Sequence, residues 1–351
     1  MGMSRRGLVA VGLAVVVAGA LGVTSTMSAQ AAQIPQAAQI PGATTATPDH
    51  AMPPALLPWG AKPSTIRTGR PGAASDTLRA TGLDAAPADT SGSRQPRERY
   101  GPKGRLGPTS YLKSATVDAG AAVPPAPTAS SSDQLFFYNY GKQTAATDGF
   151  YTTVSIAKAT LGPTDYHTLA ELAVESADGK QIVEVGWTVD RVVNGDSDPH
   201  LFVYHWVNGA ETCYNACGFE QNSASVKPGD TLAYGVVKRF GIQYFNGAWW
   251  ISFDSEWIGS FPETLWTSKG VASFSRSGLL QTFGEVAASS SKPCTQMGNG
   301  LPGADPSSAQ LSSVTLLNGP TVALTVKSTS DLYTVNGLSA RSMQYGGPGA
   351  C

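Results

Sequence analysis

The stretch that decides the fold is Ile242–Ile251, which reads IQYFNGAWWI. Asn246 and Gly247 stand between two runs that are rich in aromatic and β-branched residues. A two-residue hairpin turn needs a positive φ at both central positions, and Asn and Gly adopt it more readily than other residues. The stretch therefore predicts two antiparallel strands joined by a tight turn.

Outward from this hairpin, short alternations of apolar and polar residues recur between Gly, Pro, Asn and Asp. A period of two is typical of strands with one face in a core. It predicts strands at Leu135–Tyr140, Tyr151–Ile156, Thr168–Glu175, Gln181–Val189, Leu201–Trp206, Asp230–Val237, Gly241–Phe245, Trp249–Phe253, Gly278–Val286, Val314–Leu317, Val322–Val326 and Ser342–Tyr345. Only Pro262–Lys269 has a helical pattern. The predicted fold is all-β, an antiparallel β-sandwich of two packed sheets in preference to a barrel.

The first 132 residues differ in composition from the rest of the chain. They hold 15 of the 24 prolines but only three of the 30 aromatic residues. Such a segment buries too little apolar surface to offset its chain entropy. Residues 33–132 are therefore expected to be a mostly disordered, low-complexity pro-segment or linker, and residues 133–351 the one folded domain.

Residues 1–32 have the pattern of an export signal. Arg5 and Arg6 precede the apolar run Leu8–Val23, and Ala29-Gln30-Ala31 matches a small-residue cleavage site. The paired arginines also resemble a twin-arginine signal. We expect a secreted protein with no segment that anchors it in a membrane. The formal net charge of −1 gives no electrostatic reason to expect nucleic acid as a partner.

All four cysteines lie in the predicted folded domain, at Cys213, Cys217, Cys294 and Cys351. An even number of cysteines in an exported protein predicts two disulfides, for which three pairings are possible. We favour Cys213–Cys217 together with Cys294–Cys351, because the first two cysteines are close in sequence. The histidines make no ligand spacing with these cysteines, so no metal site is predicted.

Glu184 is a lone carboxylate in the predicted strand Gln181–Val189, where an acid is an unusual choice. One face of this strand is uniformly apolar, and Glu184 shares the other with Gly186 and Thr188. Gly186 leaves room beside the carboxylate, where another segment could approach closely. The less specific interpretation is a solvated Glu on the outer face of a sheet.

Glu285 is a second lone carboxylate, in the predicted strand Gly278–Val286. It shares a face with Gln281 and Phe283, which fits the floor of a groove as well as an ordinary polar face. Gly284 could mark a β-bulge that re-aims Glu285. Two carboxylates brought together across a sheet could share one proton, one acting as base and the other as acid in hydrolysis at low pH.

Two other functions are consistent with these features. A glycoside hydrolase also places two carboxylates in a groove lined with aromatic residues. A non-catalytic module that binds glycan or protein could stack sugar rings on Trp249, Trp250 and Trp257. Such aromatic residues more often pack in a core or flank a hairpin.

An ordered set of motifs over residues 135–351 resembles the neprosin-type family of glutamic endopeptidases. The set comprises Glu184–Val189, Gly195–Trp206, Cys213–Phe219, Trp249-Trp250, Ile258–Pro262, Phe283–Val286, Thr295–Gly298 and Gly346–Gly349. The resemblance implies an antiparallel β-sandwich with a substrate groove across one sheet. It also implies that Glu184 and Glu285 form the catalytic pair. Their neighbours Thr188, Gln281 and Phe283 are then expected in the groove.

The resemblance further implies cleavage after proline, in acid, by an enzyme made as a zymogen. The expected partner is a peptide or protein substrate rich in proline, the expected state is a monomer, and no cofactor is required. The two disulfides of the family match the pairing favoured above. Phe283 stands where the family usually has the first glycine of Gly-Gly-Glu-Val, Thr212 where it has Gly, and Ser260-Phe261 where Tyr-Trp is common. These departures bear on the substrate subsites.

Overall fold

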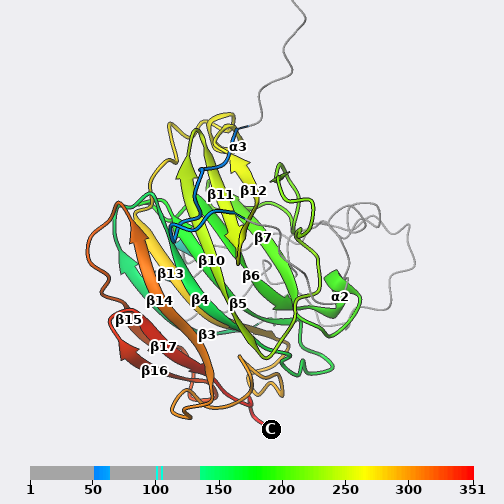
Figure 1. Cartoon of the computed structure of the whole chain (residues 1–351). Coiled ribbons are helices and arrows are strands. Elements are labelled where there is room, and N and C mark those ends of the chain that lie inside the picture. Colours follow the sequence, from blue (N-terminus) through cyan, green and yellow to red (C-terminus); the bar gives the residue numbers. More distant parts are fainter. Residues whose placement is uncertain (1–50, 64–99, 102–103, 106–134) are drawn as a thin grey trace, which may run out of the picture. The chain divides into compact units, whose positions relative to one another are not determined.

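The computed structural model describes residues 51–63, 100–101, 104–105 and 135–351 (Figure 1). All of them belong to one compact unit, His50–Cys351. The predicted signal, residues 1–32, lies outside the described residues, and so does most of the predicted pro-segment. Within the described ranges, no helix combines the length and the apolar composition of a membrane span.

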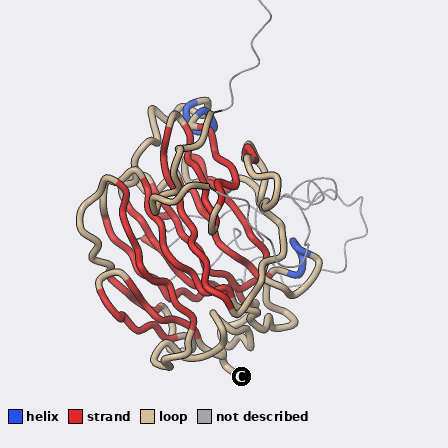
Figure 2. Tube along the Cα trace, in the orientation of Figure 1, coloured by secondary structure: helices blue, strands red, loops and turns tan. Residues whose placement is uncertain are grey.

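Two antiparallel sheets make up most of the described part of the chain, and their strands are red in Figure 2. The seven-stranded sheet has the order β15-β3-β13-β5-β6-β7-β8. Its strands are β3 (Leu135–Thr144), β5 (His167–Glu175), β6 (Ile182–Val189), β7 (His200–Val207), β8 (Ala210–Glu211), β13 (Leu279–Ala288) and β15 (Thr325–Ser328). The predicted all-β sandwich is confirmed.

The second sheet has eight strands in the order β16-β17-β14-β4-β10-β11-β12-β9. They are β4 (Gly149–Ile156), β9 (Glu220–Gln221), β10 (Val236–Phe245), β11 (Ala248–Phe253), β12 (Glu256–Pro262), β14 (Ala309–Leu317), β16 (Thr334–Ser339) and β17 (Ser342–Gly346). A separate short hairpin pairs β1 (Tyr100–Gly101) with β2 (Gly104–Arg105). Within the described residues there are two short helices, α2 (Arg191–Asn194) and α3 (Thr264–Thr267).

The core lies between the two sheets, and the apolar face of β6 enters it as predicted. Val183, Val185 and Trp187 are fully buried there. The Trp187 indole Nε1 donates to the Ser155 carbonyl of β4 at 2.9 Å and so connects the sheets across the core. Burying an aliphatic side chain of this size contributes about 1.5–3 kcal/mol, so this single strand contributes substantially to stability.

The hairpin predicted from Ile242–Ile251 is confirmed. Asn246 and Gly247 have φ values of 48° and 76°, and Phe245 pairs with Ala248 across the turn. Alternation in β11 then sends Trp249 into the core, where its indole Nε1 donates to the Phe274 carbonyl at 2.7 Å. Trp249 is therefore a structural residue, and no sugar ring can stack on it.

Several predicted elements are wrong in their bounds. Asp230–Val237 is not a strand, because Gly235 has a φ of 72° and interrupts the extended chain just before β10 begins at Val236. The predicted helix Pro262–Lys269 shrinks to α3, because Pro262 ends β12 and pairs with Ala248. The predicted strand Val322–Val326 starts too early, since β15 begins at Thr325, and Val314–Leu317 is only the end of β14. The sequence prediction also missed β12, β16 and the two-residue strands β1, β2, β8 and β9.

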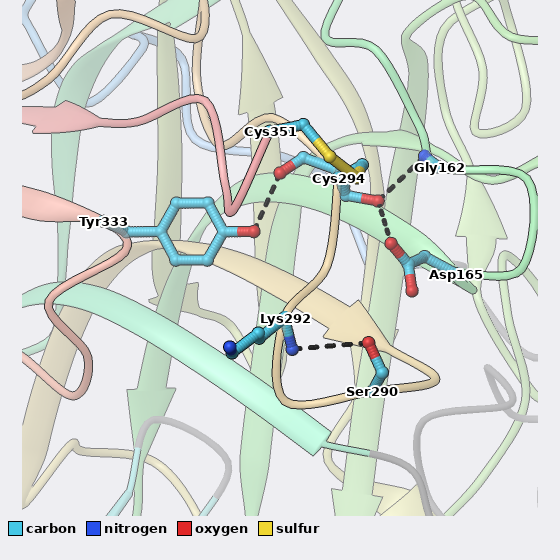
Figure 3. Close-up of a disulfide and its surroundings, with 8 residues drawn as sticks. Gly162, Asp165, Ser290, Lys292, Cys294, Tyr333 and Cys351 are labelled. Atoms are coloured by element: carbon cyan, nitrogen blue, oxygen red, sulfur yellow. Dashed lines mark hydrogen bonds between the residues drawn. A yellow bond between two sulfur atoms is a disulfide. The ribbon is translucent and has the colours of Figure 1, made fainter.

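Both favoured disulfides are present, Cys213–Cys217 and Cys294–Cys351. Figure 3 shows the second, which ties the last residue of the chain to the loop after β13. The hydroxyl of Tyr333 donates to the Thr295 carbonyl at 2.7 Å in the same loop. The Thr295 hydroxyl in turn donates to the carboxylate of Asp165, just before β5. The disulfide and these bonds hold the loop after β13 beside the start of β5.

Residues 51–63 depart from the prediction that residues 33–132 are mostly without structure. The side chain of Leu57 is buried in a small apolar cluster with Trp250 and Trp257 of the eight-stranded sheet. The Trp257 indole Nε1 donates to the Pro54 carbonyl at 3.0 Å. A few well-placed apolar residues thus order this segment, which we call the strap, although its overall composition is proline-rich.

Candidate active site

The two predicted glutamates lie on one face of the seven-stranded sheet. Glu285 on β13 pairs with Leu169 on β5, which pairs with Thr188 on β6. Directly paired residues share a face, and Glu184 shares it with Thr188 because four residues separate them along the strand. The apolar face of β6 points into the core, so this shared face points away from it. Both glutamate side chains are fully buried, which argues against the solvated alternative.

The register of β13 is continuous against both neighbours, so Gly284 does not mark the bulge that the sequence left open. Gly284 has another role. A Cβ at this position would lie 2.4 Å from Cε2 of Tyr345, whose ring is buried in the core. The glycine therefore admits an aromatic ring on the core side, and Glu285 keeps the orientation that simple alternation predicts.

Glu184 and Glu285 are not adjacent in the sheet. Strand β5 lies between β6 and β13, and Glu184 pairs with Ala173 while Glu285 pairs with Leu169. This offset of four residues amounts to two diagonal steps, or roughly 15 Å between the two Cα atoms. The backbone alone does not bring the two carboxylates into contact.

Glu171 occupies the position between them. It pairs with Phe283 on one side and with Gly186 on the other, so it is the diagonal neighbour of both glutamates. Its side chain is also fully buried. We call Glu285, Glu171 and Glu184 the acidic diagonal, in which each step spans roughly 7–8 Å between Cα atoms.

Gly186 is required by this arrangement. A Cβ at Gly186 would lie 2.2 Å from the Ala170 carbonyl oxygen and 2.6 Å from the Glu171 Cβ. The structure therefore shows what fills the room that Gly186 was predicted to leave beside Glu184. The segment that approaches closely is β5, and the side chain that occupies the room is Glu171.

Glu285 has a histidine partner. The Nε2 atom of His167 lies 2.7 Å from Oε1 of Glu285, and both side chains are buried. His167 lies on β5 two residues before Leu169, the cross-strand partner of Glu285. It therefore contacts Glu285 from the side that faces away from Glu171. A protonated imidazole in this position favours the ionised form of the carboxylate.

Glu184 is also bonded on the side away from Glu171. The Trp206 indole Nε1 donates to Oε1 of Glu184 at 3.1 Å. Trp206 pairs with Ile182, two residues before Glu184 on β6. The two outer carboxylates are thus oriented by partners at opposite ends of the acidic diagonal.

A fourth carboxylate, Glu175, lies at the end of β5 on the same face. Its pKa is raised well above the ordinary value, chiefly by burial; repulsion from Glu184 raises it further. The Gln281 amide donates a hydrogen bond to Oε1 of Glu175, which counters part of this rise. Gln281, predicted in the groove, therefore lies on the expected face but donates to a neighbouring acid.

Aromatic side chains border the acidic diagonal on both sides. Phe283, predicted in the groove, contacts Tyr138 of β3 edge to face, with 5.9 Å between ring centroids. On the other side, Tyr204 of β7 contacts Trp206 in the same way at 5.7 Å. Thr188, also predicted in the groove, is buried and pairs with Leu169, the residue that pairs with Glu285 on the other side of β5. The acids therefore lie in largely apolar surroundings, which disfavour ionising all of them together.

A family model called Neprosin matches residues 164–348, more than half of the chain, and this range contains the whole acidic diagonal. The chain belongs to the neprosin family. No curated protein matches it.

Among solved structures, the neprosin-family chain is similar to scytalido-glutamic peptidase bound to a peptide-based transition-state analogue, at 11% identity and a TM-score of 0.36 over 60% of this chain and 98% of that one. It is similar to SCP-B, an eqolisin-family peptidase, in a complex with the tripeptide Ala-Ile-His, at 10% identity and a TM-score of 0.36 over the same shares. The carbohydrate-binding module CBM66 from Bacillus subtilis has 11% identity and a TM-score of 0.25, over 42% of this chain and 79% of that one.

Three acidic or basic residues of this candidate site were missed from the sequence: Glu171, Glu175 and His167. A signal for two of them was available. The predicted strand Thr168–Glu175 alternates so that Leu169, Glu171, Ala173 and Glu175 share one face. Two acids on the same face of a buried strand are unusual. His167 had no local signal, because its partner Glu285 is 118 residues away in the sequence.

Proposed function

We propose that this chain is a secreted, acid-active glutamic endopeptidase that cleaves after proline, with Glu184 and Glu285 as its catalytic pair. Membership of the neprosin family supports the peptidase class. The observation that carries the residue assignment is the acidic diagonal, because it puts both glutamates on one buried sheet face within a continuous row of acids. Nothing in the geometry favours a glycosidase or a sugar-binding module over this function.

Glu285 is assigned as the base. The imidazole of His167 lies 2.7 Å from its carboxylate, and a positive charge on this ring would stabilise the carboxylate form of Glu285. Glu285 then takes a proton from a water molecule, and the water oxygen attacks the carbonyl carbon of the scissile peptide bond. The resulting tetrahedral species carries negative charge on the former carbonyl oxygen.

Glu184 is assigned as the acid. Its carboxyl group is buried among aromatic side chains and accepts a hydrogen bond from Trp206, an arrangement that does not require a charge on Glu184. In its protonated form it polarises the carbonyl and later donates its proton to the leaving nitrogen. The reacting peptide group lies over Glu171, between the two outer carboxylates.

Activity is expected to fall as the pH rises. Ionising three neighbouring buried carboxylates together is unfavourable, so in acid at least one keeps its proton. Glu175 adds a further group whose pKa is raised by burial and by repulsion from Glu184. At neutral pH the proton that Glu184 must donate is lost, and hydrolysis slows.

The proposed preference for proline is supported by the aromatic residues that border the site. Phe283, Tyr138 and Tyr204 are buried, but they lie on the sheet face that carries the acids and not between the two sheets, and flat apolar rings suit contact with a pyrrolidine ring. We also retain as proposals the organisation into a signal (1–32), a pro-segment (33–132) and a catalytic domain (133–351), made as a zymogen and active as a monomer. The two disulfides are compatible with an extracellular protein.

The test is hydrolysis of an internally quenched proline-containing peptide at pH 3, 5 and 7, with mass mapping of the products. Glu184→Gln and Glu285→Gln are each expected to lose at least roughly 1,000-fold in kcat/KM, because each removes a proton-transfer group. Asp331→Asn, which changes an exposed carboxylate, should match the parent chain. Undiminished activity in Glu285→Gln, or full activity at pH 7, would contradict the proposed mechanism.

A further inference from the structure

The strap, which is blue in Figure 1, lies on the outer face of the eight-stranded sheet. Trp250 and Ala248 of β11 alternate with the core residues Trp249 and Ile251, so they point away from the core. The acidic diagonal points outward from the other sheet. The contacts of the strap are therefore on the opposite side of the sandwich from the candidate active site.

The strap is rich in proline and contacts the sheet along its length. Its sequence from Ala51 to Trp59 is AMPPALLPW. Ala51 and Trp59 pack against the cluster, and Pro54 and Leu57 are buried. The chain then turns after Leu57, where the Gly60 amide donates to the Leu57 carbonyl at 2.8 Å. Met52 and Leu56 of the strap are exposed at 73% and 47%.

The face that receives the strap carries two tryptophan rings. Trp250 and Trp257 meet edge to face, with 6.2 Å between ring centroids, and Leu57 packs in the same apolar cluster. The Trp257 indole donates to the Pro54 carbonyl, a bond that recognises backbone and tolerates the missing N–H of proline.

The far end of the strap is anchored by its own aromatic residue. Trp59 packs edge to face on Tyr151 of β4 at 5.7 Å, and the Arg239 guanidinium lies 5.6 Å from the centroid of the Trp59 ring. Gly241 of β10 keeps the surface low beneath Pro58, because a Cβ there would approach the proline Cγ to 3.1 Å. The strap therefore contacts the sheet at both ends, through Leu57 at Trp250 and Trp257 and through Trp59 at Tyr151 and Arg239.

We propose that this outer face is a binding site for short proline-rich peptide segments, and that residues 51–59 fill it in cis. When the strap leaves, the face is free to hold a proline-rich segment of another polypeptide chain. The site is separate from the acidic diagonal, so the proposal stands or falls independently of the peptidase assignment.

The test uses the full chain at neutral pH and a fluorescently labelled peptide with the sequence of residues 51–63. Leu57→Asp places a charge in the Trp250–Trp257 cluster and should release the strap, so that the variant binds the peptide in fluorescence anisotropy. Leu56→Asp changes the exposed neighbour and should resemble the parent chain, which binds little because its site is filled.

Adding Trp257→Phe to Leu57→Asp should weaken binding of the peptide roughly five- to tenfold through loss of the indole donor. A peptide with both Pro53 and Pro54 changed to Ala should also bind more weakly. A folded Leu57→Asp chain that binds no peptide would overturn the proposal.

A second measurement covers the case in which Leu57→Asp does not fold. Trypsin can separate the strap from the rest of the parent chain at Arg67 or Arg79. Native mass spectrometry should then show the strap fragment retained on the clipped chain and displaced by excess peptide of residues 51–63, with the Pro-to-Ala peptide less effective. Immediate loss of the fragment, or equal displacement by both peptides, would reject a proline-selective site.

Discussion

The imidazole Nε2 of His167 lies 2.7 Å from Oε1 of Glu285, and both side chains are buried in the sheet face that carries the acidic diagonal. Glu171 of β5 and Tyr138 of β3, its cross-strand partner, also face Glu285. Of these three neighbours, His167 is the one whose protonated side chain carries a positive charge. The pair therefore gives Glu285 a local reason to ionise.

Replacing His167 by Gln should move the rising limb of the pH–activity profile to higher pH, by about one unit, because Glu285 loses the cation that favours its carboxylate form. The value of kcat/KM at the parent optimum should fall roughly 10- to 100-fold. The shift of the profile and the fall in kcat/KM are both measured by peptide hydrolysis between pH 2 and 7. A uniform loss with an unshifted profile would mean that His167 only supports the structure.

Gly186→Ala should disturb the site through Glu171. The added Cβ would meet the Ala170 carbonyl oxygen at 2.2 Å, so β5 and β6 must shift, at a cost of about 1–3 kcal/mol in the free energy of unfolding. Glu171 and Glu184 would move with them, and the pH–activity profile should change shape. Urea denaturation and peptide hydrolysis measure the two effects.

Gly284→Ala is the matched control for that variant. Its Cβ would meet the Tyr345 ring on the core side of β13, next to Glu285 in sequence. It should destabilise the fold to a similar degree but leave the shape of the pH–activity profile unchanged. If both variants altered the profile alike, the effect of Gly186→Ala would reflect general loosening of the sheet.

His205 should make the fold less stable in acid. Burial lowers its pKa to about 3, and the side chain lies against Phe261 and Trp266 in the core. An unfolded histidine takes up a proton below about pH 6.5, while the folded one does not, so stability falls as pH decreases between these two values. His205 contributes up to about 1.4 kcal/mol per pH unit to the slope of the unfolding free energy against pH. His205→Gln should flatten the dependence of the unfolding free energy on pH.

Thr212→Val is a control that removes a hydrogen bond to His205 without removing the histidine itself. The Thr212 hydroxyl donates to the His205 carbonyl at 2.6 Å and lies 3.0 Å from its Nδ1. Removing the hydroxyl should lower stability at every pH from 3 to 7 while the slope persists. Glu175 acts in the opposite direction, since a raised folded pKa favours the folded state as the pH falls. Its contribution is the same in all three chains.

The two disulfides should contribute unequally. Cys294 and Cys351 are 57 residues apart in the sequence, and Cys213 and Cys217 only four. The chain-entropy model gives about 4 kcal/mol for the longer loop and about 2 kcal/mol for the shorter one. Paired Cys-to-Ser variants of each disulfide, compared by urea denaturation, check the order. A larger loss from the shorter loop would contradict the entropic account.

Sequence alone determined which face of β6 and β13 each residue occupies and where the Asn246-Gly247 turn lies. Alternation gave the faces of β6 and β13, and hence the side of the sheet on which Glu184 and Glu285 lie. The Asn246-Gly247 turn fixed an antiparallel hairpin, because only a few residue types adopt positive φ cheaply. These features are decided within a few residues of the backbone, which is why the pattern was sufficient.

Tertiary structure decided which strands lie beside each other. Placing β5 between β6 and β13 inserts Glu171 between the two predicted glutamates and brings His167 to Glu285, across 118 residues of sequence. The same is true of the strap, where Leu57 finds Trp250 and Trp257 nearly 200 residues further along the chain. Such neighbours follow from how the whole chain buries its apolar surface, and a period of two or three in one segment carries no information about the segment it will meet.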